Sequence, residues 1–89
     1  MAKFDGVKGY LLLEVEKKPD EVTLVFRDNR YLFVTSQGGQ IDVSDDGVAG
    51  LELESVAEDG RRLECLFKGG RRFVVVSNGG TLNTDSIPE

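Results

Sequence analysis

The sequence predicts an all-β protein with about six strands, arranged as two tandem three-stranded repeats in a small barrel or roll. The first observation behind this prediction is an internal repeat. Residues 5–41 align without a gap with residues 46–82 at a constant offset of 41. Of the 37 aligned positions, 12 are identical. The second observation is that each repeat holds two runs of β-branched and aromatic residues joined by a turn signal. Two copies of one unit predict a pseudo-two-fold axis within a single domain that spans residues 1–89.

The second half of each repeat is expected to form a hairpin. In the first repeat, the strand-like runs 22–27 and 30–36 flank Asp28-Asn29, and the equivalent runs of the second repeat flank Gly69-Gly70. Two-residue connections of Asp, Asn or Gly suit a type I′ turn, in which both central residues take a positive φ.

A two-residue turn also fixes a register for each hairpin. It pairs Leu24 with Phe33 and puts Leu32 and Val34 on the opposite face, together with Val25. Large apolar residues then occur on both faces of the hairpin. This pattern is typical of central strands in a roll or barrel, or of a sheet that a second copy covers.

The first strand of each repeat is less regular. Leu12 and Val15 are apolar in both repeats and lie three residues apart, which does not fit the period of two of a flat strand. Either a bulge interrupts the strand near Leu13-Glu14 and Glu54-Ser55, or the segment is helical. The glycine at the entry, Gly9, and the lack of an N-cap residue favour a bulged strand.

The segments after the hairpins are expected to be irregular. Residues 40–46 are interpreted as a linker between the repeats. Residues 83–89 hold only Ile87 as an apolar anchor, so this tail is expected to fray.

Composition favours a soluble intracellular domain. The net charge of −5 argues against generic affinity for nucleic acid or for anionic membranes. Cys65 is the only cysteine, and its repeat equivalent is Leu24, so we interpret it as a small buried hydrophobe in a reducing compartment. No signal pattern is seen and the longest apolar run, 10–13, is too short to span a bilayer, so a cytoplasmic location is expected.

Catalysis and metal binding have little support in the sequence. Histidine is absent, which excludes Ser-His-Asp and Cys-His systems and imidazole-based metal sites. The segment 42–47 has the opening pattern of a calcium loop, but its twelfth position is Leu53 rather than glutamate and no helix is expected on either side. We therefore expect no enzyme activity, no cofactor and no metal.

One candidate ligand site comes from motifs that both repeats share. Ser36 and Ser77 each open a Ser-x-Gly-Gly loop whose backbone amides could bind an anion. Arg30 and Arg71 belong to basic residues at the two hairpin tips, which could bind a phosphate or an acidic partner. The competing interpretation is structural, with a tight turn that requires glycine and with solvated charges that block edge-to-edge pairing. The ligand-binding form of this prediction is a small-molecule or anion-binding barrel.

The differences between the repeats point to an interface. Leu11 and Leu13 stand where the second repeat has Glu52 and Glu54, and Tyr10 directly precedes them. The first repeat is thus expected to present an apolar stripe of Tyr10, Leu11 and Leu13 where its equivalent is solvated. The favoured function is a non-catalytic interaction or assembly module that forms a homodimer, or binds another protein, through this stripe.

Overall fold

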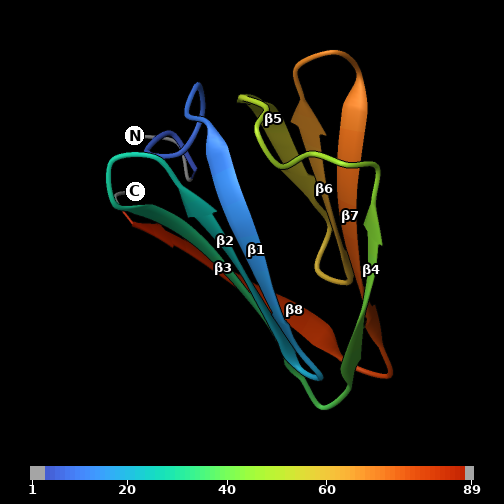
Figure 1. The fold of residues 1–89 in the computed structure, drawn as a ribbon. Coiled ribbons are helices and arrows are strands. Elements are labelled where there is room, and N and C mark those ends of the chain that lie inside the picture. The colour runs from blue at the N-terminus through green and yellow to red at the C-terminus, as the bar shows by residue number, and fades with distance from the viewer. Residues whose placement is uncertain (1–3, 88–89) are drawn as a thin grey trace.

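A computed structural model describes residues 4–87, which form eight strands in two antiparallel sheets without a helix (Figure 1). The strands are β1 (Leu12–Lys18), β2 (Glu21–Phe26), β3 (Arg30–Gln37), β4 (Gln40–Asp45), β5 (Leu53–Glu58), β6 (Arg62–Phe67), β7 (Arg71–Asn78) and β8 (Thr81–Ile87). The all-β prediction is confirmed. The predictions of six strands and of a barrel are wrong, because there are eight strands and each sheet is open, with two edges.

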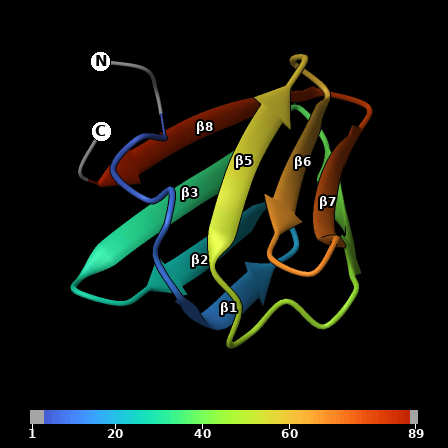
Figure 2. The same cartoon turned by 90° about the horizontal axis from the view of Figure 1, so that it is seen from above.

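Each sheet takes three consecutive strands from one half of the chain and its fourth strand from the other half. The orders are β1-β2-β3-β8 in the first sheet and β4-β7-β6-β5 in the second. The chain therefore changes sheets after β3 and again after β7. Figures 1 and 2 show the result, two sheets that face one another and meet where these two corners lie.

The two strands that the sequence analysis missed are the two that change sheets. Residues 40–45 were expected to be a linker and form β4, while residues 83–87 were expected to fray and form most of β8; residues 88 and 89 lie outside the described part of the chain. Both strands are edge strands that turn mostly polar side chains to solvent. Their apolar content is accordingly low, although Ile41 and Val43 keep the period of two on the inner face of β4.

The hairpin register differs by one residue from the prediction. Phe26 pairs with Arg30 and Leu24 pairs with Leu32, so three residues rather than two separate the paired ends. Positive φ occurs at Asp28 (66°) and Asn29 (57°), as the turn signal indicates, yet the pairing is shifted. Because a shift of one residue exchanges the faces, Leu32 is buried and Phe33 points outward.

The bulges in the first strand of each half are confirmed. The register of β1 against β2 shifts between Leu12 and Glu14, and that of β5 against β6 shifts between Leu53 and Ser55. Leu13 is thus the inserted residue in β1. It lies between Leu12 and Val15, whose spacing of three residues predicted an irregular strand. The helical alternative for this segment is excluded.

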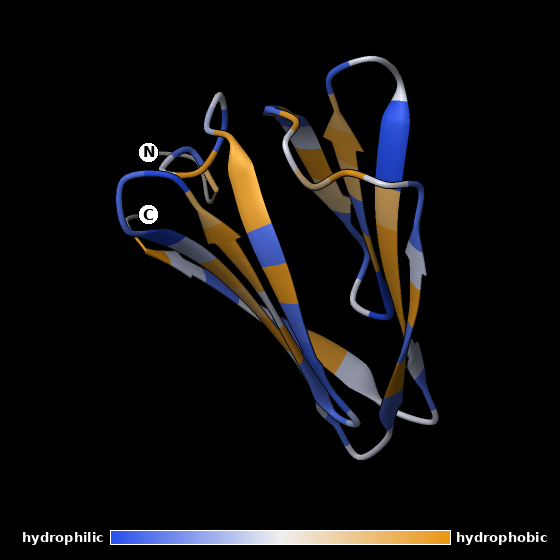
Figure 3. Cartoon of the chain, viewed as in Figure 1, coloured by the Kyte–Doolittle hydropathy of each residue, from blue (hydrophilic) through white to orange (hydrophobic). Residues whose placement is uncertain are grey.

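The core lies between the two sheets and takes equivalent side chains from both halves. The rings of Phe26 and Phe67, which are 41 residues apart, stack with centroids 6.4 Å apart and planes 6° apart. Figure 3 shows hydrophobic bands along the strands of both sheets and a hydrophilic turn from β2 to β3. The buried apolar residues are Phe4, Val7, Leu12, Val22, Leu24, Phe26, Leu32, Val34, Val48, Leu53, Leu63, Cys65, Phe67, Phe73 and Val75.

The two corners at which the chain changes sheets touch each other through bare backbone. A Cβ atom on Gly39 would lie 2.1 Å from the carbonyl oxygen of Asn78, and one on Gly80 would lie 2.1 Å from that of Gln37. Any side chain at either position would therefore force the corners apart. The second glycine of each Ser-x-Gly-Gly motif is required by this close approach, and the first, Gly38 in the β3–β4 corner, by its φ of 82°.

Backbone hydrogen bonds between the halves also recur at the repeat spacing. The Leu12 N–H donates to the carbonyl of Leu51 (2.9 Å), and the Leu53 N–H donates to the carbonyl of Tyr10 (3.1 Å). These reciprocal bonds join the start of β1 to the start of β5. The pseudo-two-fold axis itself stays a prediction.

We predict that Gly39→Ala and Gly80→Ala each destabilise the fold by about 3 kcal/mol, because the new methyl group overlaps a carbonyl oxygen of the opposite corner. Urea unfolding followed by circular dichroism measures the loss. The control is Gly70→Asn, since the repeat equivalent Asn29 already takes a positive φ with a side chain. Equal stability of the Gly39 variant and the control would contradict the crossing of the corners.

Candidate interaction surface

The two serines of the predicted anion site bond to each other. The hydroxyl oxygens of Ser36 and Ser77 lie 2.8 Å apart, and Ser77 is buried. Each hydroxyl thus has a partner within the protein. The pair lies next to the crossing corners and joins equivalent positions of the two halves, where it satisfies two polar groups that the fold removes from solvent.

The two arginines of that predicted site hold the segments that precede the first strand of each half. The Arg30 guanidinium donates through Nη1 to the carbonyl of Gly6 and lies 3.9 Å above the centre of the Tyr10 ring. Arg71 donates through Nη1 to the carbonyl of Asp46 (2.9 Å). These contacts give the arginine after each hairpin turn a structural role within its own half of the molecule.

The serines and arginines do not come together. Arg30 and Ser36 stand at opposite ends of β3, about 20 Å apart at the rise of an extended strand. Arg71 and Ser77 are separated in the same way on β7. The predicted ligand-binding set is therefore distributed over two ends of the molecule.

The three residues of the predicted stripe differ in how much of each side chain is exposed to a possible partner. Tyr10 packs against the core and under Arg30. Leu11 is partly buried and forms an isolated β-bridge with Glu52, its own repeat equivalent. Leu13, the bulge residue, has 53% of its surface exposed. Only Leu13 is freely available to a partner.

The register extends this exposed leucine into a larger apolar surface on the outer face of the first sheet. Leu13 is the bulge residue directly before Glu14, the partner of Val25; Val25 in turn pairs with Tyr31, and Tyr31 pairs with Ile87. Phe33 lies two residues along β3 from Tyr31, and the two rings stack 5.9 Å apart at 17°. Side chains directly opposite on neighbouring strands are in contact range. We call Leu13, Val25, Tyr31, Phe33 and Ile87 the outer patch.

Carboxylates border the outer patch without cations to match them. Glu14 pairs with Val25 in the sheet register, Asp85 pairs with Phe33, and Glu16 follows on β1. Among residues 4–87, no ion pair reaches any of these three carboxylates. In the described part of the chain, this face has one ion pair, which joins Lys18 to Glu21 (3.8 Å).

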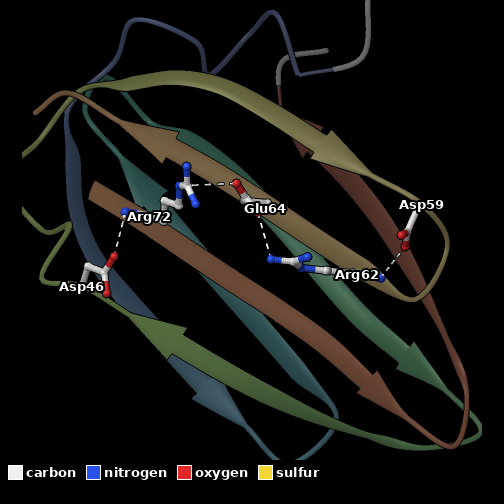
Figure 4. Close-up of polar contacts among 5 residues, drawn as sticks. All are labelled: Asp46, Asp59, Arg62, Glu64 and Arg72. Carbon is white, nitrogen blue, oxygen red and sulfur yellow. Dashed lines mark hydrogen bonds and ion pairs between the residues drawn. The ribbon is translucent and has the colours of Figure 1, made fainter. Parts of the chain in front are cut away.

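The outer face of the second sheet carries a ladder of paired charges instead. Glu64 binds Arg62 (2.9 Å) and Arg72 (3.5 Å) through its two oxygens, as Figure 4 shows. The backbone N–H groups of the same arginines donate to the carboxylates of Asp59 and Asp46. Each arginine thus has partners of opposite charge on this face.

The two outer faces therefore differ in chemistry at equivalent positions. The differing pairs, with the first-sheet residue named first, are Leu13 and Glu54, Val25 and Leu66, Tyr31 and Arg72, Thr23 and Glu64, and Ile87 and Asp46. Apart from Val25 and Leu66, each pair replaces an apolar or neutral residue by a charged one. The outer face of the second sheet still has Leu66, Val74 and the exposed Val76, so the first sheet differs by its apolar Leu13, Tyr31 and Ile87 at positions where the second sheet is charged.

A small pocket lies on the second sheet, away from the outer patch. It has a volume of about 140 Å³ and is lined by Ala57, Glu58, Asp59, Arg62 and Glu64. In the described part of the chain no three potential metal ligands gather at one place. Cys65, the one free thiol, is fully buried, and desolvation with a smaller contribution from Glu64 raises its pKa to about 12. A thiol with this pKa is no nucleophile at neutral pH.

Comparisons of the chain with protein-family models, with curated proteins and with solved structures found no match. No helix in the described residues is long and apolar enough to cross a membrane.

Sequence reasoning identified Leu13 but missed the rest of the outer patch. The predicted register placed Phe33 on the same face as Leu24, which is the buried face, and β8, which carries Ile87, was not recognised. The signal was nevertheless present, since apolar residues on both faces of the hairpin indicated a second covered surface. What failed was the assignment of individual residues to faces.

The Ser36–Ser77 pair predicts coupled stability. Ser77→Ala leaves the Ser36 hydroxyl without a partner and should destabilise the fold by about 1 kcal/mol. The double variant Ser36→Ala/Ser77→Ala should lose less than the sum of the two single losses, because it leaves no hydroxyl unpaired. A double-mutant cycle from urea unfolding measures the coupling. Strictly additive losses would show that the hydroxyls act independently.

Cys65 predicts a pH dependence in the alkaline range. Its folded pKa of about 12 exceeds the usual thiol value, so the folded state keeps a proton that the unfolded chain releases. The stabilisation from the buried thiol is full below about pH 8.5 and declines as the pH rises through the folded pKa of about 12. The free energy of unfolding of wild type should fall more steeply than that of Cys65→Val over this range. Parallel curves would contradict the raised pKa.

Proposed function

We propose that the protein is a non-catalytic protein-interaction module whose contact surface is the outer patch of the first sheet. The proposal keeps Leu13 from the stripe inferred from sequence. It replaces Tyr10 and Leu11, which have contacts within the molecule, by the neighbouring Tyr31 and Phe33. A cytoplasmic location and a thiol that stays reduced are part of the proposal.

The observation that supports this function is the contrast between the two outer faces. Both faces belong to four-stranded antiparallel sheets with equivalent strand orders. The fold by itself therefore does not require an apolar outer face. The second sheet has Arg72 at the position of Tyr31 and Asp46 at the position of Ile87. An exposed apolar cluster that the same fold can do without is best explained by a partner.

The size of the patch suits a modest affinity. Burying the remaining exposed area of its side chains is worth roughly 1 kcal/mol each, or about 5 kcal/mol for the whole patch. Association entropy offsets much of this gain, so further polar contacts are needed for a stable complex. The outer patch is therefore proposed as the centre of an interface rather than as all of it.

The scaffold behind the surface is proposed to consist of two strand-exchanged repeats related by a pseudo-two-fold axis. Three contacts support this relation, because each joins a residue to the residue 41 positions later: Leu11 with Glu52, Phe26 with Phe67, and Ser36 with Ser77. A residue that touches its own equivalent lies beside the axis of such a pair. On this proposal the binding surface occurs once in each molecule, since the second sheet has Glu54 and Arg72 where the first sheet has Leu13 and Tyr31.

Selection of random peptides displayed on phage tests the function without a known partner. Wild type should enrich peptides that do not bind Leu13→Glu/Tyr31→Arg, a variant that carries the residues found at the same positions of the second repeat. The matched control is Val76→Thr, which removes an exposed apolar residue from the second sheet and introduces the residue of the first. Peptides that bind all three proteins alike would contradict the proposed surface.

Self-association uses the same surface and is tested by light scattering coupled to size exclusion. A wild-type dimer that becomes a monomer in Leu13→Glu/Tyr31→Arg would identify a second copy as the partner. A dimer that survives in this variant would place the self-contact elsewhere on the molecule.

A further inference from the structure

We propose that the partner of the outer patch is a positively charged segment of another protein, with apolar or aromatic side chains between its lysine or arginine residues. This inference rests on the proposed function and adds the chemistry of the ligand. It follows from three observations: the unpaired carboxylates, the exposed aromatic pair and the position of the missing cations.

The first observation is that the carboxylates around the patch lack cations. Glu14, Glu16 and Asp85 have no ion pair with any residue of the described chain, and Asp85 accepts one hydrogen bond, from the N–H of Ser86. On the second sheet, by contrast, the carboxylate of Glu64 is held by two arginines. The arginine pairing of Glu64 thus has no counterpart at the three carboxylates that border the outer patch.

The second observation concerns the positions of the two arginines that pair with Glu64 on the second sheet. Arg62 and Arg72 of the second sheet correspond to Glu21 and Tyr31 of the first. One cation is therefore replaced by a further acid, and the other by an aromatic ring at the centre of the outer patch. A segment that brings its own cations would restore on the first sheet the charge pairing that the second sheet makes internally.

The third observation is the geometry of the aromatic pair. Phe33 and Tyr31 stack on each other and are partly exposed, and Asp85 lies directly opposite Phe33 on β8. A lysine or arginine head group placed over the rings would gain a cation–π contact and reach the Asp85 carboxylate. Arg30 over Tyr10 shows that the chain already uses this type of contact, at 3.9 Å. The ring pair and its acidic border together favour a basic ligand.

The carboxylates around the outer patch disfavour a second copy of the chain, nucleic acids and anionic membranes as its partner. A second copy related by a two-fold axis would bring Glu14, Glu16 and Asp85 against an equally acidic face, and the only lysine paired on that face, Lys18, is engaged with Glu21. Nucleic acids and anionic membranes carry the wrong charge for this border. A basic segment is the occupant for which charge and apolar character agree.

The test uses three fluorescein-labelled short peptides with the same leucine and phenylalanine residues at alternate positions. The intervening positions hold arginine, serine or glutamate. Fluorescence anisotropy with the full-length protein should show the arginine peptide binding about tenfold more tightly than the serine peptide, and the glutamate peptide binding most weakly. High salt should reduce the affinity for the arginine peptide towards that for the serine peptide.

Two variants separate the charge inference from the proposed function. In Glu14→Ser/Glu16→Ala, which introduces residues of the second repeat, the preference for arginine over serine should fall severalfold while the serine peptide binds as before. The charge-matched control is Glu52→Gln/Glu54→Gln on and before β5, which should keep the preference. In Leu13→Glu/Tyr31→Arg, binding of both the arginine and the serine peptide should be lost. Circular dichroism confirms that each variant is folded.

The possible results are distinguishable. If the patch variant abolishes binding but the three peptides bind wild type equally, the charge inference fails and the interaction surface stands. If the arginine peptide binds the patch variant as well as wild type, both proposals fail. If no peptide binds, or if light scattering shows a wild-type dimer that the patch variant disrupts, the basic partner is overturned, in the latter case in favour of a second copy.

Discussion

The close approach of the two corners at Gly39 and Gly80 is the constraint on which the rest of the structure depends. Because neither position has a side chain, the chain can leave each sheet at the same place and cross to the other. The crossing delivers β4 and β8 as fourth strands to the sheets of the opposite half. Neither sheet is complete without both halves, so the 84 described residues, 4 to 87, fold around one shared core.

This interlocking explains which residues the repeats share. Inner positions face their own equivalents or nearby ones across the core, as Phe26 does with Phe67, so both halves must keep matching shapes there. Outer positions face solvent and do not constrain each other. The two sheets could therefore acquire different outer surfaces, a charge ladder centred on Glu64 and an apolar surface centred on Tyr31, without any change in the fold.

The sequence predicted the parts of the fold that depend on local periodicity and on the repeat. Strand class, the hairpins and the bulge at Leu13 all follow from patterns within one repeat. Two features could not be obtained in this way. The register of the β2–β3 hairpin depends on how the turn at Asp28 closes, and a one-residue error there placed Phe33 on the same face as Leu24 instead of the opposite one. The polar edge strand β8 is held by long-range pairing with β3, which leaves little apolar signal in its own residues.

The contrast between the outer faces bears on function because the two sheets have the same architecture and differ in the residues on their outer faces. The second sheet shows that this scaffold can have a charged outer surface in which the arginines and Glu64 are paired. The first sheet exposes Leu13 and Ile87 instead and leaves Glu14 and Asp85 without cations. Exposed apolar area favours aggregation and unpaired acids repel one another, so neither feature helps an isolated molecule. A positively charged partner with apolar side chains compensates for both at once, which is why the two features are best explained together.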